Sequence, residues 1–452
     1  MSAAAFAVFL GAVILLIILI CLRVPVAFAL IGTSAIGLAV ASGMGIAERA
    51  LGSSAFGSTA DYALAVIPLF VLMGAFAARA GLAGDLFDVI ERHTKKLPGG
   101  LAIAGISASA GFAAITGSSV ATVASIGKTA IEEMRSHGYD VRFAAGSVAI
   151  AGTLGIMIPP SVALVLYGIV TGTSIGQLLI AGVVPGIVSA ILYALVAIIL
   201  ATRRPELAGG ASRAARSSPT SPPVAIAPAW DNKKYWSVVK VAVLFGIVIV
   251  GVYSGVYTAT EAGAIGAFAA VLLLLFTGQR DGSPRLRALG GALLESTRLT
   301  SSVFLIVVGG ALLTFLMVRL GVPAAFAEWA GSLPVPGWTL VVVLLLIMVP
   351  LGMFLDSISI ILVFIPVVFP VVEALGYNPI VFGILAIKLI EIGMVTPPVG
   401  MNAFVIASSV PGVRAEDAFR GVLPFLLADV AFVILIMMVP DIVLFLPNAM
   451  VS

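Results

Sequence analysis

The 452-residue sequence is 61% hydrophobic and 10% charged, with a mean hydropathy of +1.21 and a formal net charge of +3. Soluble globular proteins carry about 25% charged residues, so this composition excludes a soluble enzyme with a large water-facing surface. The many small residues, among them 48 glycines, are typical of a polytopic helical membrane protein, and the unbroken apolar runs exclude a closed β-barrel.

Most membrane segments are visible as apolar runs, because about 20 apolar residues cross a bilayer as a helix. The simple runs are residues 3–22, 24–42, 62–80, 178–201, 235–256, 259–277, 299–319 and 420–446. No Lys or Arg precedes the first run, so we expect a retained helix rather than a secretory signal peptide. Two longer apolar stretches, 99–170 and 337–410, are interrupted by Gly, Pro and Ser. Each is predicted to form a re-entrant hairpin followed by a broken helix.

A hydrophilic segment, residues 203–234, divides the chain into a first half, 1–202, and a second half, 235–452. This segment is rich in Ser, Pro, Ala and Gly, which predicts a flexible cytoplasmic linker. The re-entrant hairpins are expected at about 99–134 and 337–373, and the broken helices at about 141–170 and 379–410.

The distribution of basic residues predicts the orientation of the chain. If the N-terminus lies outside, all of the 24 basic residues except Arg49, Arg319 and Lys388 lie on the cytoplasmic side. The cytoplasmic loops would then be at Arg23, 79–96, 128–142, 203–240, 280–298 and 414–420. The opposite orientation would place these basic loops outside, so we expect an outside N-terminus.

The two halves match at positions that lie 238 residues apart. The matches are Gly138-Tyr139-Asp140 with Gly376-Tyr377-Asn378, Gly155 with Gly393, and Pro159-Pro160 with Pro397-Pro398. The predicted orientation starts the first half outside and the second half inside, so we expect inverted repeats. Inverted repeats with interrupted segments are typical of secondary transporters, whose binding site lies near the interruptions.

The tips of the predicted hairpins carry polar residues, Thr116-Gly117-Ser118-Ser119 in the first half and Asp356-Ser357 in the second. Backbone that leaves a helix inside the membrane is tolerated only where protein, ions or water satisfy its polar groups. Hydroxyl and carbonyl oxygens are hard ligands that suit Na⁺. Asp356 is either a functional carboxylate, as intramembrane acids commonly are, or an ordinary cap of the next helix.

The paired prolines interrupt the helices that follow the hairpins. Two consecutive prolines remove two N–H donors, which leaves carbonyl oxygens free to bind a cation. The next half-helix begins with free N–H groups and a positive dipole end, which suits an anionic substrate. A plain proline kink is the alternative.

Other chemistry has less support in this sequence. Lys388 and Glu391 are three residues apart on one predicted helix, where they would form a structural ion pair or contact a substrate carboxylate. The stretch Gly172-Thr173-Ser174-Ile175-Gly176 fits a nucleophile elbow, but that motif needs a strand-to-helix turn and a histidine partner. No catalytic constellation is present, so we do not expect an enzyme, and no nucleotide-binding motif is present, so we do not expect direct use of ATP.

Two stretches of sequence resemble a known family. They are IPPSVALVLYG (158–168) and, in the second half, LDSISIILVFIPVVFPVVEALGYNP (355–379) with EIGMVTPPVGMNAFVI (391–406). They are similar to the large membrane subunit, of DctM type, of tripartite ATP-independent periplasmic (TRAP) transporters. The resemblance covers nearly the whole chain. It implies the fold of the ion transporter superfamily, with scaffold helices and an elevator motion that is driven by Na⁺ in the bacterial inner membrane.

The resemblance also implies partners, a substrate class and site residues. The expected partners are a small four-helix membrane subunit (DctQ type) and a periplasmic substrate-binding protein (DctP type). The expected substrate is an organic acid, such as a C4-dicarboxylate, sialic acid or another sugar or keto acid. No four-helix segment precedes residue 1, which implies a separate small subunit, and the N-terminus would be periplasmic. The implied Na⁺ ligands are Gly117, Ser118, Ser119, Pro159, Asp356, Ser357 and Pro397. The implied substrate-binding residues are Thr153, Ser161, Thr396, Gly400 and Asn402.

Electrostatic work sets a lower limit on the number of ions. A dianion that enters against 100 mV loses about 4.6 kcal/mol, since each charge is worth about 2.3 kcal/mol, so at least two Na⁺ are expected. No organic cofactor is implied. The alternatives are a standalone Na⁺-coupled carrier of the same superfamily and, with less support, a channel or a membrane enzyme.

Overall fold

The computed structural model describes residues 2–209, 233–276 and 284–451. Within these ranges the chain forms helices joined by short turns, with no β-strand. Nine helical segments of the described chain are long and apolar enough to cross a membrane, or ten if one bent pair counts as a single span. The predicted class, an all-helical polytopic membrane protein, is confirmed.

The helices follow one another in two series. The first contains α1 (Ala3–Cys21), α2 (Val26–Ser42), α3 (Met44–Gly57), η1 (Tyr62–Ala65), α4 (Val66–Arg79), α5 (Leu82–Thr94), α6 (Gly100–Thr116), α7 (Ser119–Ser136), α8 (Val141–Met157), α9 (Val162–Thr171), α10 (Ile175–Arg203) and η2 (Pro205–Leu207). The second contains α12 (Lys233–Tyr253), α13 (Ala259–Phe276), α14 (Arg285–Arg319), α15 (Val322–Ser332), α16 (Gly337–Phe354), α17 (Ser357–Ala374), α18 (Pro379–Met394), α19 (Met401–Ser409), α20 (Ala415–Met438) and α21 (Asp441–Val451). Of the predicted linker 203–234, residues 210–232 lie outside the described residues.

Three segments that we predict as loops are largely helical. Residues 79–96 contain α5, whose apolar side chains, among them Leu86 and Phe87, are buried. Residues 128–142 contain the last turns of α7, and residues 280–298 contain the first turns of α14. These turns carry charged residues on exposed faces, so their low hydropathy reflects contact with water and not the absence of a helix.

One predicted span is two helices. The apolar run 420–446 is divided between α20 and α21, and Pro440 lies in the short connection between them. Proline has no N–H to continue the hydrogen-bond ladder and its ring clashes with the preceding turn, so the helix stops there. Mean hydropathy is insensitive to this local effect.

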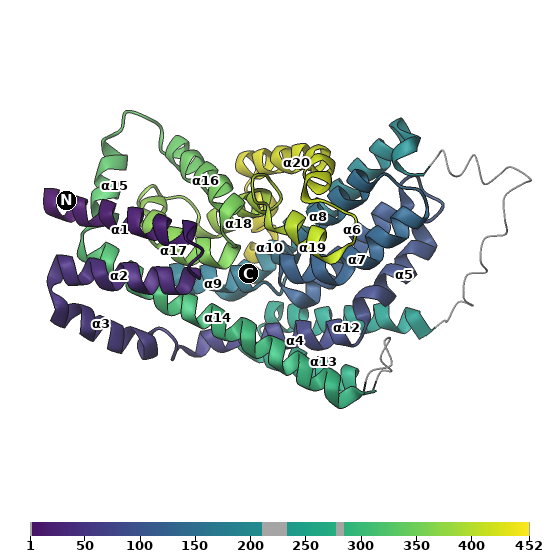
Figure 1. Cartoon of the computed structure of the whole chain (residues 1–452), viewed down its shortest axis with the longest axis horizontal. Helices are drawn as coiled ribbons and strands as arrows, with labels where there is room; N and C mark the ends of the chain where they lie inside the picture. The colour runs from purple at the N-terminus through teal and green to yellow at the C-terminus, as the bar shows by residue number, and fades with distance from the viewer. Residues whose placement is uncertain (1, 210–232, 277–283, 452) are drawn as a thin grey trace, which may run out of the picture.

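The two halves of the chain are interleaved in space. Helix α2 packs on α14, α4 on α13, α8 on α20, and α9 on α17. The long α14 extends across the molecule, from α2 and α3 to α4 (Figure 1). Helix α8 lies at the centre of a group formed by α6, α7, α10, α18, α19 and α20, which we call the central body. Neither half encloses its own core, so the chain folds as one unit.

Small residues let α8 and α20 approach closely. A Cβ atom added to Gly421 on α20 would overlap the carbonyl oxygen of Arg142 and lie 3.0 Å from the Cα atom of Gly146 on α8. Membrane helices use such small residues to gain packing energy where lipid offers no hydrophobic driving force. This contact joins one helix of each half.

Replacing Gly421 by Ala is therefore expected to destabilise the protein by about 1–3 kcal/mol, because overpacking must push the two helices apart. The matched control is Gly246→Ala on α12, where a Cβ atom would have no neighbour within 4 Å. The control is expected to be neutral or to gain about 0.5–1 kcal/mol from lower backbone entropy in the unfolded chain. Unfolding in detergent measures both variants, and equal stabilities would contradict the close packing.

Candidate functional site

The first hairpin turns at Gly117 and Ser118, which we call the first tip. Gly117 has a φ angle of +59°, a left-handed conformation that favours glycine. Ser118 caps α7, since its hydroxyl oxygen accepts a hydrogen bond from the Ala121 N–H at 3.4 Å. The Thr122 hydroxyl donates to the Ser118 carbonyl oxygen at 2.9 Å. The tip is thus held by local hydrogen bonds.

The first break, residues 158–161, separates α8 and α9, whose axes differ by 43°. Pro159 and Pro160 are buried and joined by a cis peptide bond. Ser161 is wholly buried and caps α9 by accepting a hydrogen bond from the Leu164 N–H at 3.2 Å. The first tip lies directly on this break, because a Cβ atom on Gly117 would overlap the carbonyl oxygen of Pro160.

The second hairpin turns at Leu355 and Asp356, the second tip. Asp356 caps α17, and its carboxylate accepts hydrogen bonds from the N–H groups of Ile358 at 3.1 Å and Ser359 at 3.2 Å. It also accepts a short hydrogen bond from the Ser359 hydroxyl. The capping alternative for Asp356 is therefore present in the structure, while a role as a Na⁺ ligand stays a prediction.

The second break, residues 395–400, separates α18 and α19. The Gly400 N–H donates to the carbonyl oxygen of Met353, just before the second tip, at 3.3 Å. The Thr396 hydroxyl donates to the carbonyl oxygen of Ile392 at 2.5 Å. Pro397 is exposed here, whereas Pro159 in the first break is buried. The two breaks therefore differ in their access to the surroundings.

Asn402 joins the two halves at this point. Its amide nitrogen donates to the Ser119 hydroxyl at 2.7 Å and to the Ala149 carbonyl oxygen at 3.2 Å. Both Asn402 and Ser119 are buried, so these bonds are shielded from water. The first tip thus contacts the break of its own half, and Ser119 directly after it contacts the start of α19 in the other half.

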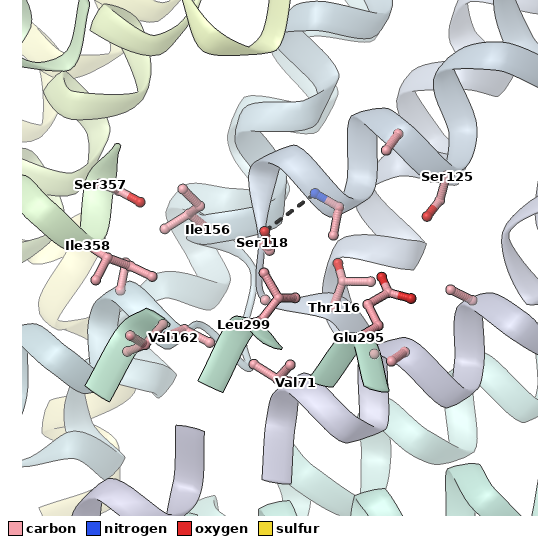
Figure 2. A pocket seen from close by; sticks show the side chains of 18 residues that line it. Val71, Thr116, Ser118, Ser125, Ile156, Val162, Glu295, Leu299, Ser357 and Ile358 are labelled. Carbon is pink, nitrogen blue, oxygen red and sulfur yellow. Dashed lines mark hydrogen bonds between the residues drawn. The ribbon is translucent and has the colours of Figure 1, made fainter. Parts of the chain in front are cut away.

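A cavity of about 180 Å³ lies between the central body and helices α4 and α14 (Figure 2). Of the predicted site residues, Gly117, Ser118 and Ser357 line it. The others do not line this cavity: Ser119, Thr153, Pro159, Ser161, Asp356, Thr396, Pro397, Gly400 and Asn402. Among them Ser119, Thr153, Ser161 and Asn402 are buried, whereas Pro397 is exposed.

Two polar residues of the cavity, Ser125 and Glu295, are absent from the sequence prediction, and a third, Thr116, belongs to the predicted hairpin tip but not to the implied ligands. Figure 2 shows Glu295 and Thr116 on the same side of the cavity. Glu295 forms an ion pair with Arg79 of α4 at 3.0 Å, so its charge is balanced beside the cavity. Glu295 lies in the charged first turns of α14, so it does not stand out when the segment 280–298 is predicted as a loop.

A second polar cluster lies inside the central body. Lys388 of α18 forms an ion pair with Asp429 of α20 at 2.7 Å, and both side chains are fully buried. The predicted pairing of Lys388 with Glu391 is therefore wrong. Helix spacing places residues three apart near each other, but a partner from another helix reached the ammonium group at hydrogen-bond distance.

Comparisons with known proteins agree on one family. The family model described as the tripartite ATP-independent periplasmic transporter, DctM component, matches residues 13–442. The C4-dicarboxylate TRAP transporter large permease protein DctM of Pseudomonas aeruginosa is 36% identical over 402 residues, which cover 88% of this chain and 90% of that protein. The sialic acid TRAP transporter large permease protein SiaM of Vibrio cholerae is 29% identical over 429 residues, or 94% and 95% of the two chains.

A solved structure is similar in fold. The YdaH transporter of Alcanivorax borkumensis superposes with a TM-score of 0.57 over 87% of this chain and 88% of that chain. The two sequences are 14% identical, so the likeness concerns the fold alone.

Proposed function

This chain belongs to the DctM family of large permease subunits of TRAP transporters, and we propose that it takes up an organic acid in symport with Na⁺. The main support is the meeting of tips and breaks: Gly117 lies on Pro160, Gly400 bonds Met353, and Asn402 bonds Ser119. Secondary transporters build their ion and substrate sites from such interrupted helices.

The proposed Na⁺ regions contain Gly117, Ser118, Ser119 and Pro159 in the first half, and Asp356, Ser357 and Pro397 in the second. The proposed substrate contacts are Thr153, Ser161, Thr396, Gly400 and Asn402. The N-terminal ends of α9 and α19 are close to these residues and would favour an organic anion. Relatives that are named for C4-dicarboxylates and sialic acid support this substrate class.

The proposed motion is of elevator type. The central body, together with α9, α16 and α17, would carry the tips and breaks past α4, α13 and α14, which would stay fixed in the bilayer. The cavity between the two groups of helices supports this division, since a moving interface is packed less completely than a core. The predicted inverted repeat would give the two end states similar energies.

The proposed partners are a small membrane subunit of DctQ type and a periplasmic binding protein of DctP type, in the bacterial inner membrane. The N-terminus would be periplasmic, so that the basic loops face the cytoplasm.

Uptake into proteoliposomes tests this proposal. The chain would be reconstituted with the small subunit and supplied with binding protein that carries a labelled C4-dicarboxylate or sialic acid, with and without an inward Na⁺ gradient. We expect uptake only with both the binding protein and Na⁺. Uptake by this chain alone would instead support the standalone carrier.

Replacing Asp356 by Asn tests the Na⁺ assignment without losing the helix cap, because Asn caps helices as well as Asp. Loss of one charged contact costs about 1.5–3 kcal/mol, so the Na⁺ concentration for half-maximal uptake is expected to rise at least about tenfold. Asp140→Asn is the matched control, since Asp140 caps α8 through the N–H groups of Arg142 and Phe143. An unchanged Na⁺ requirement in the Asp356 variant would remove that assignment.

A further inference from the structure

In the polar cluster of the central body, each charged group except one residue has a partner of opposite charge. Asp429 accepts hydrogen bonds from the Lys388 ammonium group and from the Tyr193 hydroxyl of α10, both at 2.7 Å. Lys388 also donates to the Tyr193 oxygen at 3.1 Å, and that oxygen lies 3.3 Å from the Thr153 hydroxyl. The one positive charge and the one negative charge of this network therefore balance.

Glu391 lies one helical turn beyond Lys388 on α18 and is 0% exposed. Neither of its carboxyl oxygens has a hydrogen-bond partner. Of the acidic side chains buried in the described residues, Asp417 and Asp429 each have a partner, although the Oδ2 atom of Asp429 has none. Glu391 is thus the buried acid that the visible network does not satisfy.

The surroundings of Glu391 come from four helices. Lys388 on its own helix and Asp429 on α20 are the charged groups that act on it, and Tyr193 of α10 stands beside them. Helix α8 presents the backbone N–H of Ile156, which faces the carboxyl group without reaching hydrogen-bond geometry. The Ile156 side chain lines the cavity between the tips, so Glu391 lies behind the wall of the candidate site.

An ionised carboxylate in this place would be a charge without a partner inside the membrane. The loss of hydration makes such a charge so costly that the group takes up a counter-ion or a proton instead. Lys388 already pairs with Asp429, and Glu391 is not among the residues that line the cavity beside the first tip. A metal ion needs several oxygen ligands and space, whereas a proton needs neither.

We propose that Glu391 is a proton-binding site, at which the carboxyl group is held as the neutral acid beside the closed Lys388–Asp429 pair. The central body then carries no net charge from this cluster. If the central body moves as proposed above, a neutral cluster crosses the membrane field without electrical work, so the Na⁺ ions and the substrate alone determine the charge moved.

Infrared spectroscopy of the purified full-length protein tests the site directly and does not depend on the proposed function. The C=O stretching band of a protonated carboxyl group is expected in the wild type at neutral pH, absent in Glu391→Gln, and retained in Glu373→Gln. Glu373 is an exposed glutamate on α17 and serves as the matched control. Identical carboxyl bands in the wild type and Glu391→Gln would overturn the proposal, because Glu391 would then be ionised.

Two further variants test the role of the neighbouring pair. In Asp429→Asn, Lys388 loses its partner, so Glu391 is expected to ionise as the substitute and its band to disappear. In the double variant Lys388→Met with Asp429→Asn, no cation remains and the band is expected to return. A band that stays in Asp429→Asn would overturn the charge relation among the three groups.

Transport gives a third readout, which rests on the proposed function. Wild-type uptake is expected to fall at alkaline pH as Glu391 ionises, whereas Glu391→Gln should keep its uptake there and Glu373→Gln should follow the wild type. A rise in the Na⁺ requirement of Glu391→Gln would place a metal ion at this carboxyl group and overturn the proton assignment. Failure of all uptake, with the infrared bands as expected, would count against the proposed function only.

Discussion

Replacing Lys388 by Met is expected to destabilise the folded protein by about 3–5 kcal/mol, the cost of removing one partner from a buried ion pair. Asp429 would lose its cation, so its carboxylate would stay unpaired or take up a proton at a cost, and the Tyr193 hydroxyl would lose its Lys388 donor. The free energy of unfolding, from denaturant titration in detergent, measures the effect.

Two variants separate this effect from the loss of a lysine as such. Lys128 of α7 is exposed, so Lys128→Met is expected to change stability by no more than about 0.5 kcal/mol. The double variant Lys388→Met with Asp429→Asn removes both charges and is expected to recover much of the lost stability. A Lys388→Met protein as stable as the wild type would show that the buried pair is not ionised.

Replacing Gly117 by Ala is expected to lower Na⁺-dependent uptake at least about tenfold. A left-handed backbone costs a residue with a Cβ atom about 1–2 kcal/mol, and the new methyl group would also overlap the Pro160 carbonyl oxygen. Since about 1.4 kcal/mol corresponds to a factor of ten, displacement of the tip from the break accounts for this loss.

The control for Gly117 is Gly172→Ala at the end of α9. Gly172 has a φ angle of +71°, and a Cβ atom there would meet nothing within 4 Å, so this variant has the backbone strain without the collision. We expect a smaller loss of stability and near-normal uptake in Gly172→Ala. Equal uptake in the two variants would mean that contact between tip and break is unimportant.

Around the interruptions, the local backbone structure could be predicted from the sequence. Proline acts on its own turn, so helices α8 and α18 end at Met157 and Met394, shortly before the paired prolines. Asp140 and its match Asn378 both cap helices, and Gly138 and Gly376 both have positive φ angles. These properties depend on a few neighbouring residues, which is why matched sequence leads to matched local structure.

Hydropathy was less informative where helices leave the membrane or meet other helices. Glu295 lines the cavity, but it lies in the charged turns of α14, which hydropathy predicts as a loop. The partner of Lys388 could not be predicted, because Asp429 lies 41 residues away on another helix while Glu391 lies one turn away. The spacing of residues along a helix predicts contacts within that helix only, whereas this buried ion pair joins two helices.

The sequence by itself determined that this protein is an all-helical membrane protein of the TRAP large permease family, with interruptions at paired prolines. Composition, apolar length and proline act locally or additively, so they can be read without a fold. Only the tertiary structure decided that Gly117 lies on Pro160, that Ser119 bonds Asn402, and that Lys388 pairs with Asp429. Those contacts join segments far apart in the chain, and close packing of the two interleaved halves is what selects them.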